Sequence, residues 1–131
     1  MQDPSRLRVF RTAEHIALQV YRLTQAFPFE ERFGLAQQMR RAAVAIGSDI
    51  AEGCGRSGAR DFARFLEMAL GSAAELQFQL RIAHKSGYVD AADYGTATND
   101  LQQIQPMLIR LIKRVRPAPG SSRGRPLTNN Q

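Results

Sequence analysis

Apolar residues recur every three or four positions along most of this chain, which is the spacing that lines one face of an α-helix. Four segments follow the pattern, over about residues 6–25, 30–53, 59–86 and 91–115. No segment alternates between apolar and polar residues as a half-buried strand does. The pattern therefore predicts an all-α protein with four helices.

Helix-breaking residues separate the four segments. Pro28 ends the first, because proline has no backbone N–H and disfavours helix in the residue before it. The glycines at 53 and 55 end the second and Gly87 ends the third, since glycine readily adopts the conformations that close helices. Short connections between amphipathic helices favour antiparallel neighbours. Residues 1–116 are thus expected to form an up-down-up-down four-helix bundle.

Two caps and one kink are also predicted. Ser57 and Asp90 are placed to cap the N-termini of the third and fourth helices. Pro106 lies inside the fourth segment and should kink it, because proline in an unsupported helix interior costs roughly 3 kcal/mol. Residues 117–131, PAPGSSRGRPLTNNQ, have almost nothing to bury and are expected to be a disordered basic tail.

The third segment has more than one apolar side. Its main stripe includes Leu76, whereas Phe78 and Ile82 fall off that stripe. A second apolar side on a bundle helix indicates a contact between subunits. The small residues of the run 71–74 are expected to let a neighbouring helix come unusually close.

Charge is distributed unevenly along the 131 residues, whose formal net charge is +6. Residues 1–100 contain 12 basic and 12 acidic side chains, and residues 101–131 contain six basic and no acidic ones. In an antiparallel bundle the start of the first helix, the turn between the second and third, and the end of the fourth share one end. That end is therefore expected to be basic.

A basic end suits the phosphate backbone of RNA or DNA, and without interleaved aromatic residues binding would be largely independent of sequence. The residues expected to make these contacts are Arg6, Arg8, Arg11, Arg110, Lys113, Arg114 and Arg116. Two alternatives stay open. In the first, the cations only stabilise a helix C-terminus and keep the protein in solution. In the second, they bind an acidic protein partner.

The acids Asp49 and Glu52 lie three residues apart near the end of the second segment and share a helix face. Such a pair can act in general acid/base catalysis or bind a divalent metal. Carboxylates near a helix C-terminus oppose the helix dipole, however, so ion pairing with cations is the favoured interpretation. The residues expected to form structural ion pairs are Arg40, Arg41, Asp49, Glu52, Arg56 and Glu75.

Several classes of protein are not indicated. The longest stretch without a charged residue, Leu101 to Ile109, spans nine residues, too few for a membrane helix of roughly twenty. The first ten residues do not resemble a secretory signal, and the single Cys54 permits no disulfide within the chain. Neither His15 nor His84 follows a glutamate at the spacing of di-iron bundles. We therefore expect a cytoplasmic protein with no catalytic residues, metal or cofactor.

Specific motifs between Phe27 and Tyr88 point to a known family. They are Phe27-Pro28, Glu31, Phe33-Gly34-Leu35, Gln38-Met39-Arg40-Arg41-Ala42-Ala43-Val44, Ile50-Ala51-Glu52-Gly53, Gly55-Arg56, Phe62, Phe65-Leu66, Ala69, Gly71-Ser72 and Glu75-Leu76. This half of the chain resembles the small bacterial four-helix bundles encoded by intervening sequences of large-subunit ribosomal RNA genes. It is also similar to the accessory protein of diversity-generating retroelements.

The resemblance implies a homopentameric ring of bundles and, for some relatives, a role linked to RNA or to a reverse transcriptase. Most members have no defined biochemical role. Ala45 stands where a serine is common and Asp49 where an asparagine is common. Both differences lie on the second helix, so they would change any hydrogen bonds that the family makes there.

Three functions are compatible with these features. The leading hypothesis is a non-enzymatic oligomeric adaptor or scaffold that contacts RNA or DNA, and possible partners include a nucleic-acid-processing protein. The second is a protein-interaction module without nucleic-acid binding. The third is a metal-assisted hydrolase that uses Asp49 and Glu52.

Overall fold

The computed structural model describes residues 3–116, and most of them are helical. The elements, in chain order, are the 3-10 turn η1 (Pro4–Arg6), α1 (Arg8–Thr24), the 3-10 turn η2 (Phe29–Glu31), α2 (Leu35–Cys54), α3 (Ala59–Lys85) and α4 (Ala91–Val115). Within the described residues no strand occurs, so the all-α prediction is confirmed. The predicted tail, 117–131, lies outside the described residues.

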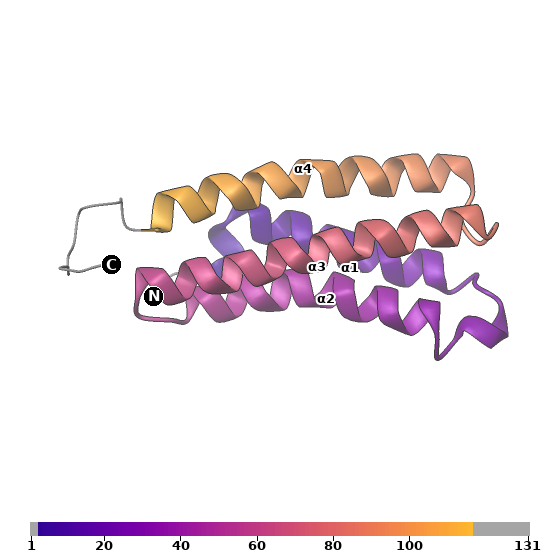
Figure 1. Cartoon of the computed structure of the whole chain (residues 1–131), viewed down its shortest axis with the longest axis horizontal. Helices are drawn as coiled ribbons and strands as arrows, with labels where there is room; N and C mark the ends of the chain where they lie inside the picture. The colour runs from indigo at the N-terminus through magenta and orange to yellow at the C-terminus, as the bar shows by residue number, and fades with distance from the viewer. Residues whose placement is uncertain (1–2, 117–131) are drawn as a thin grey trace.

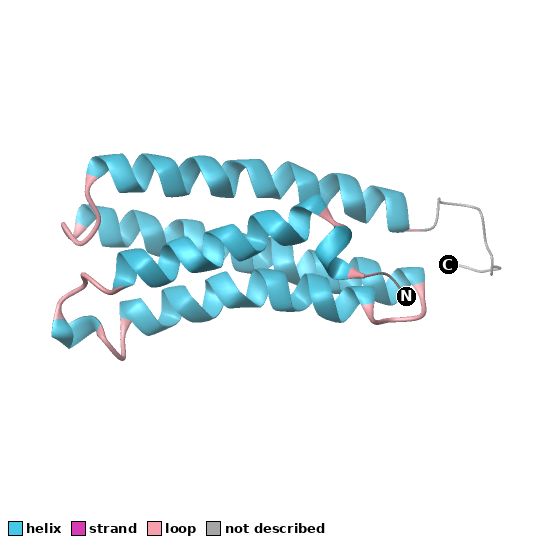
Figure 2. Ribbon diagram, turned by 180° about the vertical axis from the view of Figure 1, so that it is seen from behind, coloured by secondary structure: helices cyan, strands magenta, loops and turns pink. Residues whose placement is uncertain are grey.

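The four helices run antiparallel to their neighbours in a single elongated bundle (Figure 1). The contact between α2 and α3 is the most extensive, and the contact between α1 and α4 is the least. The start of the chain, the turn between α2 and α3 and the end of α4 lie at the same end, as Figure 2 also shows from behind. The predicted topology and its shared end are therefore confirmed.

Local chemistry explains most helix ends. The Asp90 carboxylate caps α4 by accepting a hydrogen bond from the backbone N–H of Asp93 at 2.8 Å. Gly87 follows α3 with a φ of 82°, a conformation that favours glycine, and the N–H of Tyr88 closes the helix on the carbonyl of Ala83 at 2.9 Å.

Two further sequence expectations concern the N-cap of α3 and the proline inside α4. The predicted cap Ser57 is wrong, because Gly58 occupies the N-cap position of α3 and no side chain caps it there. Pro106 lies within α4 with its side chain exposed, and the helix continues from Ala91 to Val115. The proline does not end α4, which contacts both α1 and α3, and the kink at Pro106 stays a prediction.

The core follows the predicted stripes closely. Leu76, Ile46 and Leu108 are fully buried where three different helices face the bundle axis. On α1 the buried stripe begins at Val9 and includes Ile16 and Val20, whereas Tyr21 is 43% exposed. The apolar side of α1 is thus turned away from Tyr21 and toward Val9.

The close approach of α2 and α3 occurs at Gly53. A β-carbon at this position would lie 2.9 Å from Cδ1 of Phe62 and 3.1 Å from Cβ of Phe65. Within one chain the run 71–74 provides no close approach at Gly71, which is exposed and where a β-carbon would meet nothing within 4 Å. Only Ala73 of that run is fully buried.

Candidate nucleic-acid interface

The two ends of the bundle differ in charge. Three described segments, 3–11, 49–67 and 106–116, meet at one end and together contain ten basic and five acidic residues. The opposite end, formed by 24–38 and 84–95, contains two basic and four acidic residues. We call these the basic end and the acidic end. The molecule is therefore electrically polar along its length, as the sequence predicted.

Most of the predicted phosphate-binding cations are exposed at the basic end. Arg6 and Arg8 come from the first turns of the chain, and Arg110, Lys113 and Arg114 come from the last turns of α4. Within residues 3–116 none of these five lies within ion-pair distance of a carboxylate. Arg11 is also exposed on α1. The last helical turns of α4 thus bring three exposed cations to the end where the chain begins.

Arg116 differs from the other predicted cations because it is paired. Its guanidinium lies against the carboxylate of Glu67, and the contact joins the end of α4 to α3. Both side chains are about half exposed, and exposed ion pairs of this kind add at most about 1 kcal/mol to stability. Arg116 is therefore less available for phosphate than its neighbours on α4.

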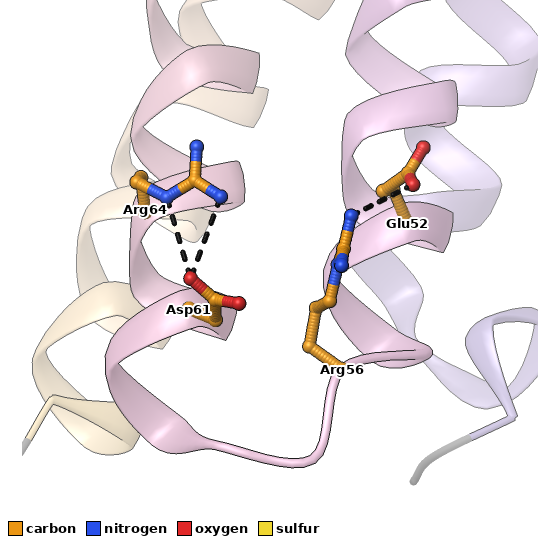
Figure 3. Close-up of polar contacts among 4 residues, drawn as sticks. All are labelled: Glu52, Arg56, Asp61 and Arg64. Carbon is orange, nitrogen blue, oxygen red and sulfur yellow. Dashed lines mark hydrogen bonds and ion pairs between the residues drawn. The ribbon is translucent and has the colours of Figure 1, made fainter.

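Two further ion pairs lie beside the turn between α2 and α3 (Figure 3). Arg56 donates to Glu52 at 3.1 Å, and Arg64 lies 3.4 Å from Asp61. The guanidinium carbons of Arg56 and Arg64 also lie 4.8 and 4.6 Å from the ring centre of Phe65. Charge pairing and stacking on the ring together hold both arginines near the surface of this turn. A shallow, open depression beside it is lined by Ser48, Ala51, Glu52, Gly55 and Arg56.

Of the expected structural ion pairs, the structure forms only that between Glu52 and Arg56 within the described part of one chain. Arg40 instead binds α1, where its Nε donates to the Thr24 hydroxyl at 2.7 Å and its guanidinium lies 4.6 Å from the Tyr21 ring centre. Arg40 thus contacts α1 and forms no ion pair within the described part of the chain.

Arg41 and Glu75 are exposed, on α2 and α3 respectively. Glu75 accepts a hydrogen bond from Gln79 at 3.2 Å. Neither residue has an ion-pair partner among the described residues of the same chain. That Arg41 and Glu75 form structural ion pairs therefore stays a prediction, with partners outside the single chain.

Asp49 has no cationic partner in the described part of the chain, so its expected ion pair is wrong within one chain. Partial burial, and secondarily the nearby charge of Glu52, raise the pKa of the Asp49 carboxyl above its ordinary value of 3.8. The charged form of the Asp49 side chain is therefore less stable in the folded protein than in water.

No group of three or more His, Cys, Asp and Glu side chains within 3–116 is arranged to hold a metal ion. Cys54 is 2% exposed, and burial raises the pKa of its thiol, which disfavours the reactive thiolate. None of the described helices is long and apolar enough to cross a membrane.

Sequence reasoning missed a second prominent surface, at the acidic end. Phe29 and Phe33, in the turn between α1 and α2, are each 76% exposed, and Arg32 lies over both rings. The signal was present in the sequence, because both phenylalanines fall between the two apolar stripes rather than on either. A turn that carries two phenylalanines without burying them is a candidate contact surface.

Two comparisons find similar proteins. The sequence model of a family described as 23S rRNA-intervening sequence protein matches residues 5–110. A crystal structure of a protein of unknown function from the S23 ribosomal protein family of Bacteroides thetaiotaomicron VPI-5482 superposes with a TM-score of 0.75 and 25% sequence identity. The match covers 80% of this chain and 98% of that one. No curated protein matches this chain.

Proposed function

Because this chain belongs to the family of 23S rRNA-intervening sequence proteins, we propose that it is a non-enzymatic, homo-oligomeric adaptor that contacts RNA or DNA through its basic end. The observation that carries the proposal is the segregation of charge. Five exposed cations that lack an acidic partner in the described part of the chain gather where α1 begins and α4 ends. We place this activity in the cytoplasm, where the single, buried Cys54 stays reduced.

Phosphate groups, rather than bases, are the proposed ligands of the basic end. Its described aromatic side chains are Phe10, Phe62 and Phe65, and all three are buried or half-buried. Base stacking requires open aromatic faces, so recognition would rest on the charge of the backbone. Binding of this kind releases counterions and weakens steeply as salt concentration rises.

A salt titration with a fluorescent RNA hairpin tests this part of the proposal. The variant carries Arg110→Gln, Lys113→Gln and Arg114→Gln. The matched control, Arg22→Gln, Arg81→Gln and Lys85→Gln, removes the same charge from exposed positions away from the basic end. We expect the variant to lower the slope of log affinity against log salt by about 2–3, since each phosphate contact contributes about 0.7–0.9. Equal slopes for variant and control, or no binding at low salt, would overturn it.

The proposed oligomer uses an outer face of α3. Met68, Gly71, Phe78 and Ile82 lie on this face together with Glu75, at alternating spacings of three and four. The side chain of Phe78 is 64% exposed and that of Met68 is 45% exposed. Apolar residues at such spacing form the seam by which helices pack side by side.

A second copy can cover this face with the outer face of its own α2. That face contains Arg41 and Val44, the latter 42% exposed. Contact between two different faces repeats from copy to copy, and it closes into a ring when the rotation between neighbouring copies divides a full turn. Arg41 of one copy would then pair with Glu75 of the next, and the family resemblance implies five copies.

Mass measurement in solution, with and without nuclease, tests the ring. We expect a mass of several chains that persists after nuclease treatment. Arg41→Glu and Glu75→Arg should each lower the mass, and the double variant should restore it, because the reversed charges pair again. The control is Arg22→Glu, which should change nothing. A wild-type monomer would overturn the oligomer and leave the basic end to be tested separately.

A protein-interaction module without nucleic-acid binding is the second candidate. Its support is the exposed apolar face of α3. If the triple glutamine variant stays oligomeric but no longer binds RNA, the result favours the adaptor. Absence of RNA binding by the wild-type oligomer favours the module.

A further inference from the structure

The acidic end presents two aromatic rings to solvent. Phe29 and Phe33 are each 76% exposed. The guanidinium carbon of Arg32 lies 5.7 Å from the ring centre of Phe29 and 5.1 Å from that of Phe33. Cation–π attraction to both rings restrains the three side chains together. Large exposed areas of both rings remain open to a further ligand.

The turn that carries these rings is fixed to the rest of the bundle through Glu31. One carboxylate oxygen of Glu31 accepts the backbone N–H of Leu35 at 3.1 Å, and the other accepts the hydroxyl of Tyr88 at 3.1 Å. The Tyr88 ring also packs against Phe27, with ring centres 5.3 Å apart. The turn between α1 and α2 is therefore tied to the turn between α3 and α4. A surface held in place loses little conformational entropy when it binds.

The charge around the rings selects the kind of ligand. Glu30 is exposed directly beside Phe29 and has no ion-pair partner within residues 3–116. The acidic end as a whole has more acidic than basic residues. An uncharged apolar partner would strip water from these carboxylates without replacing it, which is unfavourable. A cationic partner would pair with them.

Guanidinium groups satisfy both features. They are planar, stack on aromatic faces and bind carboxylates in a fork-like geometry, whereas the compact, strongly hydrated ammonium of lysine does so less well. Arg32 already shows in this structure how a guanidinium lies against the two rings.

We propose that Phe29, Glu30 and Phe33 form a docking surface for an arginine-rich segment of a partner protein, which would stack on the ring areas that Arg32 leaves open. The surface lies at the end of the bundle opposite the basic end. It does not depend on nucleic-acid binding. Because the whole chain has a net charge of +6, a basic peptide has no general attraction to it, so binding must come from a local site.

The test uses the full chain and three fluorescent nine-residue peptides in which glycine alternates with arginine, with lysine or with leucine. We expect the arginine peptide to bind several-fold tighter than the lysine peptide and tighter than the leucine peptide. Phe29→Ala with Phe33→Ala should weaken binding of the arginine peptide about tenfold, because two ring contacts are lost. Glu30→Gln should weaken it about twofold to threefold and reduce its salt dependence.

The control is Phe78→Ala, which removes an equally large, 64% exposed ring from α3 and should leave peptide affinity unchanged. Unchanged circular dichroism confirms that each variant is folded. The proposal is overturned by absence of arginine-peptide binding, by equal binding to wild type and the double variant, or by tighter binding of the leucine peptide. A fall in oligomer mass in the double variant would instead assign the surface to a second copy.

Discussion

At the scale of single residues, Asp49 shows how position decides the behaviour of a charge. It lies one turn before the end of α2, close to the cationic turn, yet no arginine of the described chain pairs with it. Glu52, three residues later, finds Arg56 at 3.1 Å. Burial and like charge therefore act on Asp49 without compensation and raise the pKa of its carboxyl.

We predict that Asp49→Asn stabilises the protein near pH 7 by about 0.5 kcal/mol, the size of one relieved like-charge pair on a helix. The melting temperature should rise by about 2 °C. The stabilising effect of a neutral Asp49 is complete below pH 3.8 and is lost as pH rises through the higher pKa of the folded state. Melting curves from pH 3 to 8 should show this loss in the wild type and not in the variant.

The control for this prediction is Glu14→Gln, which removes an exposed acid from α1 and should change stability by less than about 0.5 kcal/mol. A lower melting temperature for Asp49→Asn at pH 7 would mean that the carboxylate has a favourable partner in solution, for instance in a neighbouring subunit.

At the scale of elements, the pairing of α2 with α3 depends on Gly53. We predict that Gly53→Ala destabilises the fold by about 1–3 kcal/mol, because the new methyl group collides with the Phe62 ring. Gly95→Ala, inside α4 and with open space around it, should stabilise by about 0.5–1 kcal/mol through its helix preference. Urea unfolding of both variants measures the difference. If the two substitutions changed the free energy of unfolding equally, α2 and α3 would be able to move apart and accommodate the new methyl group.

The fully buried Leu76 gives a second prediction at this scale. Leu76→Asp should unfold or dissociate the bundle, because an unpaired buried charge costs several kcal/mol. Ala74→Asp, two residues earlier and exposed, should cost about 1 kcal/mol or less, the difference in helix propensity. Thermal melting followed by circular dichroism checks both. A folded Leu76→Asp variant with wild-type melting would place the α3 stripe elsewhere.

At the scale of the whole molecule, the two ends are predicted to bind independently. The end of α4 and the turn between α1 and α2 lie at opposite ends of the bundle (Figure 1). The double alanine variant of Phe29 and Phe33 should therefore keep wild-type affinity for RNA. The triple glutamine variant of Arg110, Lys113 and Arg114 should keep wild-type affinity for the arginine peptide. Fluorescence anisotropy measures both, and a change of more than about threefold in either cross-test contradicts independence.

The sequence alone determined the features that depend on local order along the chain. Periodicity placed all four helices, and helix-breaking residues and Asp90 placed most of their ends. Antiparallel topology then sufficed to bring the cations of α1 and α4 to one end, because consecutive helices with short connections must alternate in direction.

Only the tertiary structure decided which side chains meet across helices. The rotation of each helix about its axis turned Arg40 toward Thr24, left Asp49 without a partner and exposed Tyr21. The hydrogen bond from Tyr88 to Glu31 joins the turn between α3 and α4 to the turn between α1 and α2. It thereby holds in place the turn on which Phe29 is exposed. A periodic pattern specifies which face of a helix is apolar, but packing selects the neighbour of each residue at the edge of that face, because differences of a few tens of degrees change its contacts.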